Sequence, residues 1–163
     1  MIPPTLQARL DAWRVAGDKI VFTNGVFDVL HLGHATYLAA ARELGDRLVV
    51  GVNSDDSVRR LGKGPERPIH TEADRCALLE HLSSVDATVV FGDDTPLALI
   101  ESLSPDVLVK GGDYNPSDAN PDSPQYMVGR ESVLNRGGEV RSIPLVPGHS
   151  TTSILSRSSP SNR

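Results

Sequence analysis

The stretch "IVFTNGVFDVLHLGH", residues 20–34, changes character part-way along and indicates how the chain begins to fold. Its first three residues are apolar and β-branched or aromatic, which is typical of a buried strand. Polar and glycine residues follow, and Gly33 then opens a segment with helical periodicity. The stretch therefore predicts a strand that passes through a loop into a helix, with two histidines at the junction.

The same alternation of strand and helix continues along the chain. Short runs rich in β-branched residues predict five strands, at residues 19–23, 47–53, 86–91, 106–110 and 139–144. Helical patterns cover residues 1–17, 33–44, 71–82 and 95–103, the last with Thr95 as N-cap and Pro96 at N1. Strands that alternate with helices predict an α/β fold with a doubly wound five-stranded parallel sheet.

Size and composition limit the classes of protein. A chain of 163 residues is expected to form a single domain over residues 1–163. The net charge of −5 disfavours a nucleic-acid partner, and no apolar run approaches the roughly 18 residues that a membrane span needs. The start lacks the pattern of a signal sequence, and the single Cys76 can form no internal disulfide, so we expect a cytoplasmic protein.

Three segments break the alternation. Residues 60–70 and 113–124 are rich in glycine or proline and are interpreted as long loops of the kind that often bind ligands. The tail at residues 156–163 is polar and rich in serine, and it is expected to fray.

The two histidines, His31 and His34, follow the first predicted strand at the start of a helix. Backbone N–H groups at a helix start bind anions, and a spacing of three brings both rings to one side of the turn. Gly25 and Gly33 would let the chain approach a phosphate closely. Capping or core roles remain open. A metal site with Asp28 as third ligand is disfavoured, because no further ligands follow at a suitable spacing.

Two more segments carry chemistry at predicted strand or helix ends. In "KGGDY", residues 110–114, Lys110 could reach a phosphate, Gly111 and Gly112 could admit a nucleotide, and Asp113 could accept from a ribose or base. An ordinary turn explains this segment equally well. In "GHSTT", residues 148–152, hydroxyls precede a helical pattern, so they could contact phosphate or merely cap the helix.

Basic residues gather in the first long loop, and one further arginine stands apart from them. Arg60, Lys63 and Arg67 lie in an otherwise acidic chain, although such a run is usually a solvated face. Arg75 shares a helical stripe with leucines, where an arginine normally needs an anionic partner. A structural carboxylate and a substrate phosphate are equally good candidates for that partner.

Together these motifs resemble a known family. "HLGH", residues 31–34, matches the His-x-Gly-His signature of the nucleotidyltransferases related to class I aminoacyl-tRNA synthetases, and "STTSI", residues 150–154, resembles their second signature. The longer segments "FTNGVFDVLHLGH", "LGDRLVVGVNSDDSVRRL", "VLVKGGDY" and "GGEV" are similar to the heptose 1-phosphate adenylyltransferases, either stand-alone or as half of a bifunctional kinase and adenylyltransferase. The similarity extends over residues 19–155.

This resemblance implies a Rossmann-like nucleotidyltransferase fold and a specific reaction. The family transfers AMP from ATP, with Mg²⁺, to D-glycero-D-manno-heptose 1-phosphate, releasing pyrophosphate on the route to ADP-heptose for lipopolysaccharide or another surface glycan. Its partners are therefore small molecules. The family is typically oligomeric, so a homo-oligomer is expected.

The resemblance also implies roles for individual residues. The expected catalytic residues are His31, His34, Lys63, Ser150 and Thr151. The expected nucleotide-binding residues are Thr23, Asn24, Gly25, Phe27, Gly33, His34, Lys110, Gly111, Gly112, Asp113, Ser150, Thr151 and Thr152. The expected substrate-binding residues are Asp28, Arg60, Lys63 and Arg75, and no residue is expected to bind a metal directly.

Some segments depart from the family pattern. Residues 115–128 form a longer segment than in the bifunctional enzymes, and the loop at residues 62–65 differs by about one residue, which leaves the sugar and its anomer open. Related cytidylyltransferases place an arginine where this chain has serine before Val85, which favours adenylyl transfer. The alternatives are a glycerol-phosphate or ethanolamine-phosphate cytidylyltransferase and a non-catalytic nucleotide-binding module.

Overall fold

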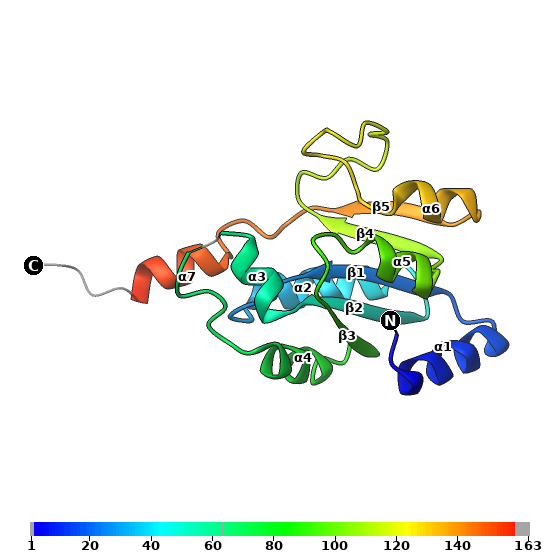
Figure 1. Cartoon of the computed structure of the whole chain (residues 1–163), viewed down its shortest axis with the longest axis horizontal. Helices are drawn as coiled ribbons and strands as arrows, with labels where there is room; N and C mark the ends of the chain where they lie inside the picture. Colours follow the sequence, from blue (N-terminus) through cyan, green and yellow to red (C-terminus); the bar gives the residue numbers. More distant parts are fainter. Residues whose placement is uncertain (1, 63, 159–163) are drawn as a thin grey trace, which may run out of the picture.

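A five-stranded parallel sheet organises the part of the chain that the structure describes. This structure is a computed structural model, and it describes residues 2–62 and 64–158. The strands are β1 (Ile20–Gly25), β2 (Arg47–Asn53), β3 (Ala87–Phe91), β4 (Val107–Gly111) and β5 (Glu139–Ile143). They lie in the order β3-β2-β1-β4-β5 (Figure 1), and every pair is parallel. The predicted doubly wound sheet is confirmed.

Helices connect the strands, and most of them match the sequence pattern. The predicted helices appear as α1 (Pro4–Ala16), α2 (Leu32–Arg42), α4 (Glu72–Glu80) and α5 (Leu97–Leu103). The helical pattern after the hydroxyls of the second signature appears as α7 (Thr151–Ser158). The structure also contains α3 (Asp55–Arg60) and α6 (Arg130–Asn135), which were not predicted from the sequence. Six residues make fewer than two helical turns, so α3 and α6 are too short to display a periodic apolar stripe.

Alternate side chains of each strand pack against opposite layers of helices. Phe22 and Leu108 face the cluster that includes α1 and α5, whereas Val21 and Val109 face the cluster that includes α2 and α4. Both faces are therefore apolar, as a buried parallel sheet requires. This double burial explains why the strands have nearly continuous apolar sequences instead of alternating ones.

The order of the strands determines where a ligand can enter. The chain builds outward from β1 through β2 to β3, and it then returns to place β4 on the other side of β1. Connections therefore diverge at the carboxyl ends of β1 and β4, which is where ligands bind in open α/β sheets. Asn24 near the end of β1 and Lys110 in β4 meet there, with Lys110 Nζ 3.5 Å from the Asn24 carbonyl oxygen.

One boundary prediction is wrong. Thr95 is not the N-cap of α5, because the helix starts at Leu97 with Pro96 at the cap position and without a side-chain cap bond. Residues 156–158, the start of the tail that is expected to fray, complete α7. Residues 159–163 lie outside the described residues. Residues 113–124 form a loop as predicted, and within the described residues no helix has both the length and the apolarity to span a membrane.

Candidate active site

The start of α2 carries the two histidines of the first signature. His31 is the N-cap residue, and its Nδ1 accepts a hydrogen bond of 3.4 Å from the backbone N–H of His34. The two rings stack with centroids 3.7 Å apart and planes 18° apart. The spacing of three thus puts both rings on one side of the turn, as the sequence predicted. His31 also caps the helix, so the capping role left open by the sequence applies as well.

Burial disfavours the charged form of both imidazoles. Removal from water lowers the pKa of His34 to about 4, and the adjacent charge of His31 adds to the effect. Burial likewise lowers the pKa of His31, with a further contribution from His149. His34 Nδ1 is also one of two buried side-chain polar atoms that have no hydrogen-bond partner among the described residues. A bound anion would provide that partner and would favour protonation of the ring.

The lowered pKa of His34 predicts a loss of stability in mild acid. Its folded-state pKa of about 4 lies below the ordinary 6.5, so between these values the unfolded chain binds more protons. The free energy of unfolding should therefore fall as the pH is lowered from 7.5 to 5. Carboxylates whose pKa is lowered on folding, such as Asp28, lose their contribution mainly at lower pH, as the pH falls through the ordinary value of 3.8 and below. Urea unfolding of His34→Gln should show a smaller loss than the wild type.

The exposed His81 provides the control for this measurement. The variant His81→Gln should keep the full acid-dependent loss. An equal loss in His34→Gln and in the wild type would contradict the assignment of the effect to His34.

Asp28 joins three segments of the site. Its carboxylate accepts hydrogen bonds from Arg67 Nε at 2.6 Å and from the backbone N–H groups of Ile69 and His70 at 2.8 and 3.0 Å. Burial alone would raise its pKa, but these bonds and the charge of Arg67 outweigh burial and hold the pKa below its usual value. The sequence predicted that Asp28 binds substrate. In the structure its carboxylate is instead occupied by the protein, and it positions the loop.

The backbone around Asp28 is held in an unusual conformation. Phe27 has φ 51° and Val29 has φ 56°, values in the left-handed region that side chains other than glycine rarely adopt. Such conformations persist where the surrounding contacts determine them, and they are common at functional sites. The bonds of Asp28 supply those contacts here.

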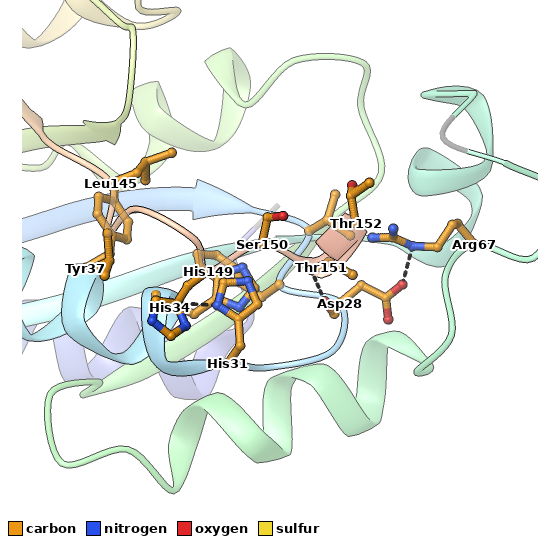
Figure 2. Close-up of a pocket in the computed structure, with 14 residues that line it drawn as sticks. Asp28, His31, His34, Tyr37, Arg67, Leu145, His149, Ser150, Thr151 and Thr152 are labelled. Atoms are coloured by element: carbon orange, nitrogen blue, oxygen red, sulfur yellow. Dashed lines mark hydrogen bonds and ion pairs between the residues drawn. The ribbon is translucent and has the colours of Figure 1, made fainter. Parts of the chain in front are cut away.

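The second signature reaches the same place from the other end of the chain. Thr151 Oγ1 donates a hydrogen bond of 2.7 Å to the backbone oxygen of Asp28, and Ser150 Oγ accepts from the backbone N–H of Ser153 as an N-cap. Both signatures line a cavity of about 580 Å³, the signature pocket (Figure 2). Its lining includes Phe27, Asp28, His31, Gly33, His34, Tyr37, Arg67, Leu145, His149, Ser150, Thr151 and Thr152.

Gly33 makes this convergence possible. A Cβ at this position would lie 2.9 Å from the His31 ring, which is closer than real contacts allow, and 3.1 Å from His149 Cβ, which is tighter than most of them. The absence of a side chain therefore lets the segment before α7 approach the start of α2.

The pocket contains residues that the sequence prediction omitted. Arg67 and His149 line it, and Figure 2 shows the Arg67 guanidinium pointing back toward Asp28 and Thr152. Tyr37 forms its wall, where its hydroxyl and that of buried Thr23 are 2.7 Å apart. Two of these residues could have been found from the sequence. Arg67 lies in the basic cluster, and His149 lies next to the second signature.

A second cavity, of about 690 Å³, adjoins the first. We call it the Lys110 pocket. It shares Val26, Phe27, His34, Tyr37 and Leu145 with the signature pocket. Its remaining lining includes Asn24, Gly25, Asn53, Asp94, Lys110, Gly111, Tyr114 and Tyr126. A third cavity, of about 680 Å³, is called the Gly112 pocket. Its lining includes Gly111, Gly112, Asp113 and Tyr114.

Some predicted site residues lie elsewhere. Thr23 is fully buried and bonded to Tyr37, and it lines none of these three cavities. Arg75 is buried with its guanidinium bonded to Asp55, so the structural carboxylate is its partner and not a ligand phosphate. Arg60 is paired with Asp94 and with the carbonyl of Gly92, at the surface. Lys63 lies outside the described residues.

The match to a protein family agrees with this geometry. Residues 22–156, which include both signatures, match the family described as cytidylyltransferase-like. The chain belongs to the cytidylyltransferase-like family. This family consists of nucleotidyltransferases, so the predicted recognition of a nucleotidyltransferase enzyme is confirmed.

Relatives of this cytidylyltransferase-like chain include two proteins named bifunctional protein HldE. The one from Hyphomonas neptunium is 53% identical over 150 residues, which is 92% of this chain and 29% of the relative. The one from Syntrophotalea carbinolica is 51% identical over 153 residues, 94% of this chain and again 29% of the relative. The chain thus spans less than a third of the length of these curated relatives.

Solved structures share the fold. A lipopolysaccharide core biosynthesis protein from Thermoplasma volcanium matches with a TM-score of 0.60 and 29% identity, over 80% of this chain and 98% of its own. Pantothenate synthetase from Thermus thermophilus matches with a TM-score of 0.51 and 19% identity, over 84% of this chain and 60% of its own. At that identity the second likeness concerns the fold alone.

Proposed function

We propose that this domain transfers AMP from ATP to D-glycero-D-manno-heptose 1-phosphate and releases pyrophosphate. The observation that carries the proposal is the convergence of both signatures in one pocket, with His31 and His34 from one end of the chain and residues 150–152 from the other. The identity of about 50% to HldE proteins supports the heptose substrate. The product, ADP-heptose, would serve the synthesis of lipopolysaccharide or another surface glycan.

The reaction needs no general base from the protein. A phosphate monoester has a second pKa near 6, so at neutral pH its oxygen is already an anion that can attack. That oxygen forms a bond to the α-phosphorus of ATP, while the bond to the bridging oxygen breaks and its electrons leave with pyrophosphate. The work left for the protein is to hold the groups in line and to stabilise charge.

The signature pocket offers the groups that such stabilisation needs. His31 and His34 would donate hydrogen bonds to oxygens of the α-phosphate, where charge develops in the transition state. The hydroxyls of residues 150–152 and the guanidinium of Arg67 would bind the β- and γ-phosphates, since arginine matches phosphate geometry. Asp28 positions Arg67 for this contact.

Adenosine would occupy the Gly112 pocket, which is lined by three of the four residues, 110–113, to which the family resemblance assigns adenosine. A Cβ at Gly111 would lie 2.8 Å from Leu145 and 3.1 Å from Tyr37, so the glycine lets these two side chains pack closely against the end of β4. Gly112 has φ +79°, a conformation that favours glycine. Bare backbone at this edge allows a nucleoside to approach closely.

Magnesium would enter with ATP as part of the substrate. Mg²⁺ is usually held by one or two carboxylates together with substrate phosphates. Asp28 is the only carboxylate among the described residues that line the signature pocket, and it is bonded to Arg67 and to two backbone N–H groups. The described side chains therefore do not form a metal site of their own, and we assign no protein ligand to the ion.

The test is pyrophosphate release with Mg²⁺, offering ATP, CTP and GTP each against both anomers of heptose 1-phosphate and against glycerol 3-phosphate and ethanolamine phosphate. We expect release with ATP and a heptose phosphate, at one preferred anomer. Release only with CTP and an alcohol phosphate would keep the family and refute the heptose assignment. Binding of ATP without any release would favour a non-catalytic nucleotide-binding module.

Two further expectations belong to this proposal. ATP is a cytoplasmic substrate, so the reaction is placed in the cytoplasm. The resemblance also implies a homo-oligomer, which sedimentation of the purified protein would test.

A further inference from the structure

The Lys110 pocket contains the positive charge of Lys110, which has no role in the proposed reaction as described so far. Lys110 is the only lysine or arginine among the described residues that line this cavity. Its ammonium group forms no ion pair with a described carboxylate, and its one hydrogen bond is a long contact of 3.5 Å to the Asn24 carbonyl. The Tyr114 ring, with its centroid 5.5 Å from Nζ, is its other neighbour. An unpaired cation in a partly buried position is costly unless an anion binds it.

The two adjoining pockets suit the two sides of an in-line displacement. In phosphoryl transfer the attacking and leaving oxygens lie on opposite sides of phosphorus. His34 lines both the signature pocket and the Lys110 pocket, which places the α-phosphate at their boundary. With pyrophosphate held by residues 150–152 in the signature pocket, the attacking phosphate has to come from the Lys110 side.

Asn24 provides an independent sign of a ligand in the same cavity. Its Oδ1 is buried and has no hydrogen-bond partner among the described residues, although buried polar atoms normally have one. A carboxamide oxygen accepts from a hydroxyl. Asn53 lines the same wall, with its amide nitrogen 2.9 Å from Ser57 Oγ. A cation beside a free acceptor for a hydroxyl, Asn24 Oδ1, fits a phosphorylated polyhydroxy compound.

We infer that Lys110 binds the phosphate of the acceptor sugar and not the nucleotide, while Asn24 accepts a hydrogen bond from one of the sugar hydroxyls. The inference rests on the proposed adenylyl transfer and assigns Lys110 as a residue that selects for the acceptor. It replaces the expectation from the family resemblance, in which Lys110 is one of the nucleotide-binding residues.

The contact between Lys110 and the acceptor phosphate should depend on pH. Burial lowers the pKa of its ammonium group to about 8, so its charge is lost in mildly alkaline solution. The other titratable or charged groups lining the cavity are His34, Tyr37, Asp94, Tyr114 and Tyr126. The pKa of His34 is lowered to about 4 and that of Tyr37 is raised to about 12, so neither titrates near pH 8. The KM for the acceptor should therefore rise above pH 8.

The test compares Lys110→Met, which removes the charge, with Lys110→Arg, which retains it at high pH. In Lys110→Met we expect the acceptor KM to rise about 10- to 100-fold, the effect of one charge-assisted hydrogen bond. The Kd of ATP, measured by calorimetry without acceptor, should change by less than about twofold, because Lys110 does not contact ATP in the proposed arrangement. In Lys110→Arg the rise of KM above pH 8 should disappear.

Lys19→Met is the matched control. Lys19 pairs with Glu139 and lines none of the three pockets, so its loss should alter neither the acceptor KM nor the Kd of ATP. A rise in the Kd of ATP with an unchanged acceptor KM in Lys110→Met would return Lys110 to the nucleotide site. No change in either constant would also overturn the inference.

A failure of the proposed function would be recognised separately. If the wild type releases no pyrophosphate with any acceptor, heptose 1-phosphate and glycerol 3-phosphate are titrated by calorimetry into protein saturated with α,β-methylene-ATP. Binding that Lys110→Met abolishes would uphold the role of Lys110 as a phosphate ligand. Binding unaffected by the substitution, or no binding in the wild type, would overturn it.

Discussion

Substitution of His34 by alanine should lower kcat about 10²- to 10³-fold, the usual effect of removing one donor that stabilises transition-state charge. The ring is neutral in the free protein, because its pKa is about 4, and it lies at the boundary of the signature and Lys110 pockets. A neutral imidazole donates one hydrogen bond, and that bond strengthens as charge builds on the α-phosphate. Pyrophosphate release under saturating substrates measures the effect.

The affinity for ATP should change much less than kcat. The remaining groups of the signature pocket, with Arg67 and Thr152 among them, would hold the triphosphate in the ground state. A rise in KM with kcat unchanged would show that His34 contributes only to ground-state binding, and it would contradict the proposed role. His81→Ala, on the exposed end of α4, should leave both constants unchanged.

His34 is a sharper target than His31. The His31 ring accepts the hydrogen bond that caps α2, so its removal disturbs the helix as well as the chemistry. His34 has no such capping role, although it stacks on His31 and its ring centroid lies 5.3 Å from that of Phe27. A thermal unfolding curve at pH 8 would check that His34→Ala remains folded.

The sequence predicted those features of the fold that depend on local patterns. The strand, loop and helix of residues 20–42 follow one another closely, so their composition and spacing contain the necessary information. The strand order fits the pattern of right-handed crossovers. The cap of α5 was assigned one residue early, because Thr95 and Pro96 both suit a helix start and only the observed backbone distinguishes between them.

The partners of charged residues were not predictable in the same way. Asp28 and Arg67 are 39 residues apart, and their pairing depends on a loop that returns to the carboxyl end of β1. A pattern of single residues cannot indicate which acid meets which base over such a distance. Asp28 therefore looked available for substrate, whereas the structure shows its carboxylate bonded to the residues that shape the pocket.

The partner of Arg75 was likewise not predictable from the sequence, and its burial predicts a large effect on stability. Substitution by methionine should lower the free energy of unfolding by about 3–5 kcal/mol, the range for breaking one side of a buried ion pair. Its side chain is completely buried, and its guanidinium bonds Asp55 at 2.8 Å, the Val26 carbonyl at 2.7 Å and the His70 carbonyl at 3.1 Å. Methionine fills similar space but leaves all three acceptors without a donor. Urea unfolding at pH 7.5 measures the loss.

Arg59 offers a matched comparison in the same region. It pairs with Asp56 at 2.6 Å on the surface of α3, where both side chains are largely exposed. Exposed pairs contribute about 0.2–1 kcal/mol, so Arg59→Met should alter the unfolding free energy by no more than this. The difference between the two variants isolates the effect of burial from the loss of a positive charge.

The two interpretations of Arg75 predict different combinations of stability and activity. A residue that bound a substrate phosphate would lose activity on substitution with little change in stability. The structural arginine seen here should lose stability first, and activity should fall because Val26 and His70 flank the segments that carry Asp28 and its loop. Removing Asp55 as well, in Arg75→Met with Asp55→Leu, should restore part of the stability because the partly buried acid is then no longer left unpaired. A stable but inactive Arg75→Met would instead favour the substrate role.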